Sequence, residues 1–127
     1  MALQFTKHYT REDAESLLPQ IREWLEELSR LRSRLSEHDE RLAQLLAKAD
    51  GLGGDLVNRW IRGLARIKDL LQEFATREIQ VKDLDRGLID FPAFVGGQEV
   101  FLCWEKDEDT IEYWHDLTSG YGGRERL

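Results

Sequence analysis

Apolar side chains recur every three or four positions between residues 21 and 74, a period typical of amphipathic helices. In the first part the spacing is that of a heptad, as in a coiled coil. Its two seam positions hold Ile21, Leu28, Leu35 and Leu42, and Trp24, Leu31, His38 and Leu45. A second stripe consists of Val57, Trp60, Leu64, Ile67, Leu71 and Phe74. The two stripes predict two long helices that pack antiparallel.

Residues typical of helix ends bound these stripes. Thr10 followed by Asp13 resembles a capping box with aspartate in place of glutamate, so the first helix is predicted to begin at Arg11. Pro19 lacks the backbone N–H that a helix uses, and it predicts either a kink or a short break. Three glycines in the segment 50–55 predict the turn between the two helices.

After residue 78 the period changes to that of strands, with β-branched and aromatic residues in short runs. The predicted strands are 79–81, 87–95, 99–105 and 111–116. Turns at Gly96–Gly97 and at 106–110 join the last three strands as antiparallel hairpins. Pro92 indicates an edge position or a bulge.

The predicted fold class is α+β, in a single domain over residues 1–127. A long antiparallel helical hairpin at about 11–78, which includes the short or kinked N-terminal helix, is followed by a small antiparallel β-sheet at about 79–116. The tail, 117–127, is too rich in glycine to predict regular structure. Four short strands cannot cover every apolar side of two long helices, so we expect a homodimer formed through the heptad seam.

Charge and cysteine content narrow the class of protein. The net charge is -7, so nucleic acid and anionic membranes should repel the chain. Most of this acidity lies in the segment 105–116. The first twenty residues contain no apolar run, which argues against a signal peptide or a membrane span. Cys103 is the only cysteine, so an intramolecular disulfide and a cysteine-rich zinc module are excluded, and we expect a cytoplasmic protein.

Four short strings near the end of the chain together resemble a bacterial family of unknown function, domain-of-unknown-function family 2203. The strings are GLIDFP (87–92), LCW (102–104), YWH (113–115) and GYGGR (120–124). The stretch 10–19 resembles the start of the same family. The resemblance implies a small bacterial cytoplasmic protein and carries no activity with it. The family often has a Gly-Glu pair in the last hairpin turn, where this chain has Asp107 before Glu108, and aspartate adopts positive φ less readily than glycine.

Cys103 and His115 are the soft metal ligands of the predicted sheet, and the strand register decides whether they meet. If Glu105 pairs with Ile111, then Cys103 faces Tyr113 and shares one face with His115. A slip of one residue separates the two ligands. In the first register a carboxylate would complete a set suited to zinc or iron. The nearby carboxylates are Asp83, Asp85, Asp90 and Glu112. The simpler interpretation is a buried cysteine beside a hydrogen-bonded histidine.

Other residues of the predicted sheet suggest binding. Trp104 and Trp114 lie in an aromatic-rich region that forms either core or a ligand pocket. Asp90 stands between apolar strand residues, so it must be exposed, paired or functional, and Arg86 and Arg124 are candidate partners. Arg124 can alternatively hold an anion within the glycine-rich tail.

The leading functional hypothesis is a noncatalytic binding or regulatory module that self-associates through its helices and has a possible protein partner. Its candidate binding residues are Asp90, Trp104, Trp114 and Arg124. The alternative is a metal-binding protein or metal-dependent enzyme in which Cys103, His115 and nearby carboxylates hold a divalent ion such as zinc or iron. A cysteine nucleophile activated by histidine is disfavoured, because the sequence identifies no oxyanion donor and no third orienting residue.

Overall fold

The computed structural model describes residues 2–47 and 54–127, without the side chains of residues 38, 42–47, 54 and 55. Two helices, α1 (Arg11–Ala47) and α2 (Gly54–Thr76), precede an antiparallel sheet. The α+β class is therefore confirmed. No helix among the described residues is long and apolar enough to cross a membrane.

The start of α1 confirms the capping box. The Thr10 hydroxyl accepts from the backbone N–H of Asp13 at 3.0 Å, and the Asp13 carboxylate accepts from the N–H of Thr10 at 3.4 Å. The helix continues through Pro19, so the predicted short break is wrong. Leu18 and Ile21 are buried on either side of Pro19, which itself points to solvent. Packing of these neighbours holds the helix together where the proline removes one hydrogen bond.

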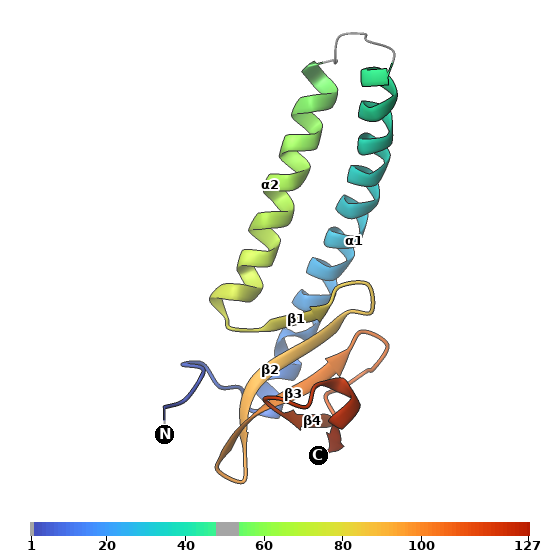
Figure 1. Cartoon of the computed structure of the whole chain (residues 1–127). Helices are drawn as coiled ribbons and strands as arrows, with labels where there is room; N and C mark the ends of the chain where they lie inside the picture. The colour runs from blue at the N-terminus through green and yellow to red at the C-terminus, as the bar shows by residue number, and fades with distance from the viewer. Residues whose placement is uncertain (1, 48–53) are drawn as a thin grey trace.

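The two helices lie side by side (Figure 1) and make specific contacts. Arg66 of α2 donates to the Glu27 carboxylate at 2.5 and 3.0 Å, and the Trp60 indole N–H donates to Asp39 at 2.9 Å. Higher numbers in α1 pair with lower numbers in α2, so the helices run in opposite directions. The predicted turn at 50–55 falls mostly outside the described residues.

The sheet has five antiparallel strands in the order β1-β2-β3-β4-β5. They are β1 (Gln80–Asp83), β2 (Leu88–Val95), β3 (Gln98–Glu105), β4 (Tyr113–Asp116) and β5 (Glu125–Arg126). A 3-10 turn, η1 (Tyr121–Gly123), precedes β5, so the prediction of a tail without regular structure is wrong. The physical reason is a set of long-range contacts, among them the bond from the Leu127 N–H to the Glu112 carbonyl at 2.8 Å.

Pro92 sits in β2 beyond the last residue that pairs with β1. The β1–β2 ladder runs only as far as the pair Gln80 and Asp90, so the missing N–H of Pro92 removes no bond to β1. Its carbonyl instead accepts from the N–H of Tyr9 at 2.7 Å. The proline therefore has the local edge position that the sequence indicated.

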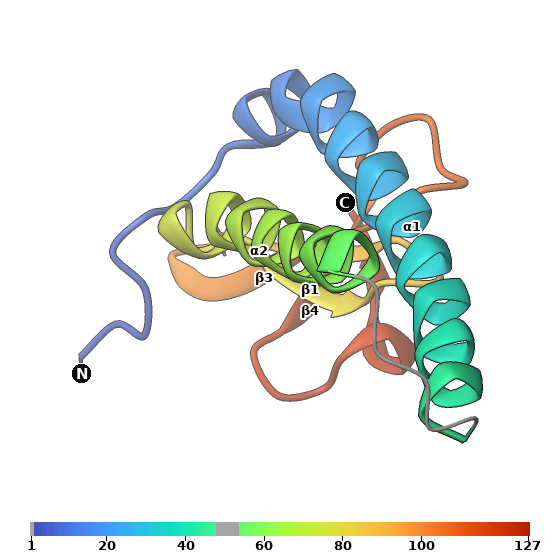
Figure 2. The same ribbon diagram turned by 90° about the horizontal axis from the view of Figure 1, so that it is seen from above.

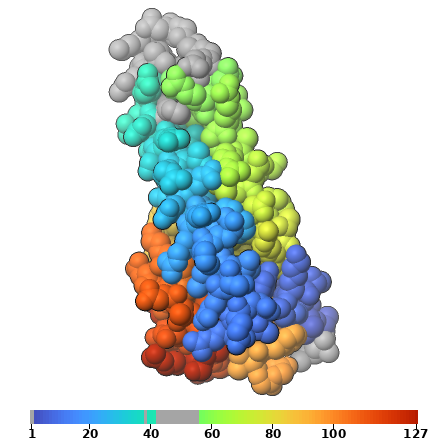
Figure 3. All heavy atoms as spheres, turned by 180° about the vertical axis from the view of Figure 1, so that it is seen from behind, coloured from blue at the N-terminus to red at the C-terminus, as the bar shows by residue number. Residues whose placement is uncertain are grey.

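Alternation along the strands gives the sheet two different faces. One face packs against the helices, and its core contains Ile89 and Phe91 of β2, Leu102 of β3 and the heptad residues Ile21 and Leu28 of α1. Figure 3 shows the first half of α1 in front of the sheet, and Figure 2 shows α1 and α2 from above, passing each other at an angle. The first half of the heptad seam is thus occupied by the chain's own sheet, and the predicted coiled-coil dimer would have to use another surface.

Candidate functional site

Asp90, Cys103 and His115 meet on the sheet face that the helices do not cover. In the ladder Cys103 stands opposite Tyr113 on one side and opposite Asp90 on the other, which is the register that unites the ligands. The carboxylate oxygen, the Sγ atom and the ring nitrogen lie within 4.8 Å of one another. All three side chains are buried. Burial of the opposite face against α1 sets this register, because a slip of one residue would turn apolar core residues to solvent.

His115 is oriented by two hydrogen bonds. Its Nδ1 atom lies 2.6 Å from the backbone carbonyl of Asp116, and a carbonyl can only accept, so Nδ1 carries a proton. Its Nε2 atom points at Oδ2 of Asp90, 2.9 Å away. A histidine that donates from one nitrogen to a carbonyl and presents the other to an acidic group has the orientation common among metal-binding histidines.

One of the two carboxylate oxygens of Asp90 lacks a hydrogen-bond partner among the described residues. This atom, Oδ1, is buried. Burial raises the pKa of the Asp90 carboxyl. The charge and hydrogen bond of His115, and after them the Cys103 thiol and the charge of Lys82, offset this only in part. A buried carboxylate oxygen without a partner costs free energy, and a bound cation is one group that would supply the missing contact.

Cys103 carries a free thiol that is buried. Burial and the neighbouring Asp90 carboxylate raise its pKa to about 12, although Arg124 acts in the opposite direction. The thiol therefore keeps its proton at neutral pH. A cation next to the sulfur reverses this, because it stabilises the thiolate directly.

A small cavity of about 200 Å³ lies next to Asp90 and His115. Strand residues such as Lys82 and Phe101 line it together with four residues of the C-terminal tail, Leu117, Thr118, Gly120 and Tyr121. This part of the tail is held in place because the Asp116 carboxylate accepts from the backbone N–H groups of Thr118 and Ser119 at 3.0 and 2.7 Å. Gly120 turns the chain with a positive φ of 67°. The site thus has a preformed opening.

Arg124 fastens the tail and does not reach Asp90. Its two terminal nitrogens donate to the two oxygens of Glu108, each at 3.0 Å. The guanidinium carbon lies 3.9 Å from the ring centroid of Tyr113 and 4.2 Å from that of Tyr121. The expectation that Arg86 or Arg124 pairs with Asp90 is therefore wrong, since His115 takes that place.

Trp104 and Trp114 belong to the opposite face of the sheet. Trp104 is wholly buried in the core, where its indole N–H donates to the Glu108 carbonyl at 2.9 Å and Arg22 lies over its ring. Trp114 packs against the same core. The structure therefore unites Asp90, Cys103 and His115, and it leaves the two tryptophans out of the site.

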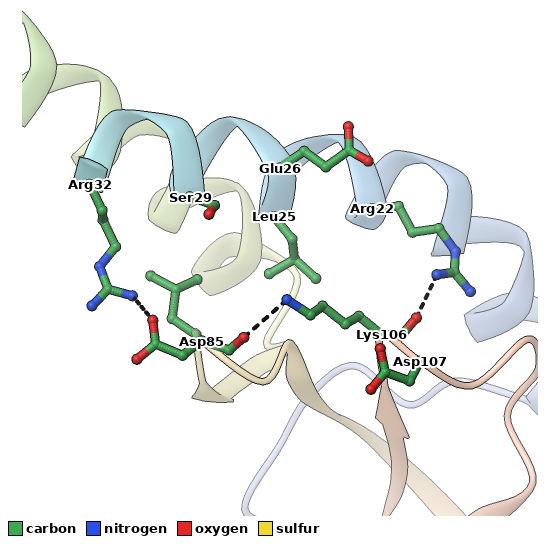
Figure 4. A pocket seen from close by; sticks show the side chains of 9 residues that line it. Arg22, Leu25, Glu26, Ser29, Arg32, Asp85, Lys106 and Asp107 are labelled. Carbon is green, nitrogen blue, oxygen red and sulfur yellow. Dashed lines mark hydrogen bonds and ion pairs between the residues drawn. The ribbon is translucent and has the colours of Figure 1, made fainter. Parts of the chain in front are cut away.

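A larger hollow, of about 360 Å³, lies between α1 and the loops of the sheet (Figure 4). Arg32 of α1 forms an ion pair with Asp85 at 2.5 Å, and Lys106 donates to the Asp85 carbonyl at 3.0 Å. Arg22 donates to the Lys106 carbonyl at 2.8 Å. These groups use their hydrogen-bonding capacity on one another. We therefore assign this hollow to the contact between α1 and the loops of the sheet.

The sequence did not point to the cavity residues Lys82, Leu117 and Tyr121, or to Glu108 as the partner of Arg124. Strand alternation indicates which face of the sheet a residue occupies, but only for residues within strands, and Leu117 and Tyr121 lie outside them. A return of the tail to the sheet was expected through Arg124, but the sequence did not identify Glu108 as the residue that Arg124 reaches.

Comparison with known proteins identifies a family for the chain, but the description of that family names no activity. The family model described as an uncharacterized conserved protein, DUF2203, matches residues 7–127. No curated protein and no solved structure matches the chain.

Proposed function

The chain belongs to the DUF2203 family, whose description names no activity, so we propose a function from the chain's own residues: it binds one divalent metal ion through Asp90, Cys103 and His115. The observation that carries the proposal is the convergence of three different ligand atoms within 4.8 Å at a buried place. The proposal takes up the alternative that the sequence left open, a metal-binding protein, in place of the leading hypothesis of a binding module around Trp104, Trp114 and Arg124.

Zinc fits this set of donors best. It binds sulfur, imidazole nitrogen and carboxylate oxygen at about 2.0–2.3 Å in a tetrahedral arrangement, which puts neighbouring ligand atoms roughly 3–4 Å apart. Iron(II) also accepts imidazole and carboxylate, but a thiolate in a small buried site favours zinc. In the metal-free protein the His115 Nε2 and Asp90 Oδ2 atoms share a hydrogen bond, and the ion would take the place of its proton.

Charge balance supports the same ion. The Asp90 carboxylate and the Cys103 thiolate each contribute one negative charge, while His115 binds as a neutral imidazole. Their sum cancels the two positive charges of zinc. A site without net charge is the arrangement that a buried environment penalises least. The ion would also give the unpartnered Oδ1 side of Asp90 a counter-charge.

Zinc binding by matched variants tests the proposal. The protein is dialysed against zinc after treatment with a chelator, and the bound metal is counted per chain. Wild type should retain one zinc, and His115→Ala and Cys103→Ser should lose it. His8→Ala is the matched control, because His8 also contacts a carboxylate, Glu99, at 2.7 Å but has no cysteine beside it. Equal retention of zinc by wild type and by His115→Ala would overturn the proposal.

We also propose that the helices act as a hairpin arm through which the chain self-associates. On α2 the side chains of Ile61, Leu64 and Leu71 are 53%, 43% and 40% exposed, and this apolar stripe is the surface left after α1 packs on the sheet. Sedimentation equilibrium should detect a dimer that Leu64→Lys weakens, and a monomer at all concentrations would contradict this.

A thiolate ligand requires a reducing compartment, which is consistent with a cytoplasmic protein.

A further inference from the structure

The cavity beside Asp90 and His115 lies where a metal ion bound by these residues would have its free coordination position. Three protein ligands leave one coordination position of a tetrahedral ion unfilled. Asp90 and His115 both border the cavity, whereas Cys103 does not. An ion held by the three residues would therefore sit with Cys103 behind it and the cavity in front of it. The free position would open toward the cavity.

The walls of the cavity combine apolar surface with one cation. Leu88, Phe101 and Leu117 supply apolar surface. The Lys82 ammonium lies 5.2 Å from the centroid of the Phe101 ring, and its charge acts on the Asp90 carboxyl, which also borders the cavity. With the charges of the ion and its ligands cancelled, Lys82 leaves one positive charge to be balanced at the cavity.

We propose that this cavity binds a small aliphatic monocarboxylate, whose carboxylate occupies the open position of the metal ion beside Lys82 and whose alkyl group lies against Phe101 and Leu117. The inference rests on the proposed metal site. A single negative charge matches the single ammonium, and a cavity of about 200 Å³ admits a ligand of only a few heavy atoms. The loop held by Asp116 forms this wall before any ligand arrives, so little ordering is needed for binding.

Cobalt(II) in place of zinc makes the test visible, because its absorption bands report both the thiolate ligand and a change in the fourth ligand. The cobalt-loaded protein is titrated with propionate and, separately, with the uncharged propionamide. Propionate should shift the ligand-field bands in a saturable way, and propionamide should not. Lys82→Met should raise the dissociation constant for propionate roughly tenfold, as expected for the loss of one charge-assisted contact. Lys68→Met, on the outer side of α2, is the matched control and should leave that constant unchanged.

The outcomes separate the two claims. Absence of a cobalt–thiolate band in wild type would mean that the metal site itself is wrong. A normal cobalt spectrum that propionate does not change would overturn the carboxylate site alone. A propionate shift that is equal in wild type and in Lys82→Met would also overturn it, because the anion would then be bound without the cavity's cation.

Discussion

The Nε2 atom of His115 lies 2.9 Å from Oδ2 of Asp90, and each of the two side chains is only 2% exposed. Buried ionisable pairs are weak evidence for stability, because the loss of hydration offsets much of their attraction. A pair of apolar residues would fill the same space at no electrostatic cost. The proposed metal site would account for the presence of this pair beside Cys103 and for the carboxylate oxygen that is unpartnered among the described residues.

The first prediction concerns the stability of this pair. Asp90→Leu alone leaves His115 buried without its partner and should lower the free energy of unfolding by about 3 kcal/mol. The double variant Asp90→Leu/His115→Leu should recover most of that loss, because both polar groups are then gone. Urea unfolding of the chelator-treated proteins measures both values. A double variant at least as unstable as Asp90→Leu would contradict this, because removal of the second polar group would then have recovered nothing.

The second prediction concerns Cys103. Because its pKa is raised to about 12 and its side chain is buried, the thiol should resist alkylating and disulfide reagents in the folded, metal-free protein at about pH 8. The same chain unfolded in guanidinium should react at the rate of an ordinary cysteine, which provides the control. Fast reaction in the folded state would mean that the sulfur is accessible and that the site is more open than described.

The third prediction concerns acid and the N-terminal segment. The Glu78 carboxylate accepts from the hydroxyl and N–H of Thr6 and from the N–H of Lys7. The Thr6 hydroxyl bond is the main cause of its lowered pKa, against a smaller opposing effect of burial. A lowered pKa in the folded state means that this contribution is complete above the unfolded pKa of 4.5 and is lost as the pH falls through the folded pKa.

Hydrogen exchange at the amides of Thr6 and Lys7 measures this effect, because Gln4 and Phe5 donate to a different carboxylate, Glu99. Wild type should protect these amides at neutral pH and lose the protection in acid, after correction for the intrinsic rate. Glu78→Gln should lack the acid-dependent part at every pH. Arg11→Gln is a suitable control, because Arg11 pairs with Glu15 within α1 and does not contact Glu78. Equal pH profiles for wild type and Glu78→Gln would contradict the assignment.

The fourth prediction concerns the tail. Arg124→Lys keeps the charge but loses the two parallel bonds to Glu108 and the flat contact with the rings of Tyr113 and Tyr121. It should lower the free energy of unfolding by about 1 kcal/mol, a modest value for a pair near the surface. Residues 117–127 should exchange faster. Arg126→Lys, whose pairing with Glu112 is long at 3.5 Å, should change neither quantity.

Strand alternation predicted the central feature of the site. The sequence analysis made the meeting of Cys103 and His115 depend on Cys103 facing Tyr113, and that register is present. The same alternation separates Trp104 from Cys103, because adjacent residues of a strand point to opposite faces. The sequence analysis grouped these residues by composition, and alternation shows why Trp104 lies in the core.

The remaining errors come from contacts between distant parts of the chain. The tail is ordered because Arg124 reaches Glu108 and because Leu127 bonds to Glu112, and neither contact has a local sequence signal. The continuity of α1 at Pro19 likewise depends on burial of its neighbours in the core of the whole fold. Local propensity is overridden in such places by tertiary packing.

Native mass spectrometry of protein purified without a chelator tests the metal site most directly. The account predicts that wild type carries the extra mass of one metal ion per chain, that the mass survives dialysis, and that it is absent from Cys103→Ser prepared in the same way. A metal-free mass for wild type even after addition of zinc, or the same bound metal on Cys103→Ser, would contradict the assignment of Asp90, Cys103 and His115 as a metal site.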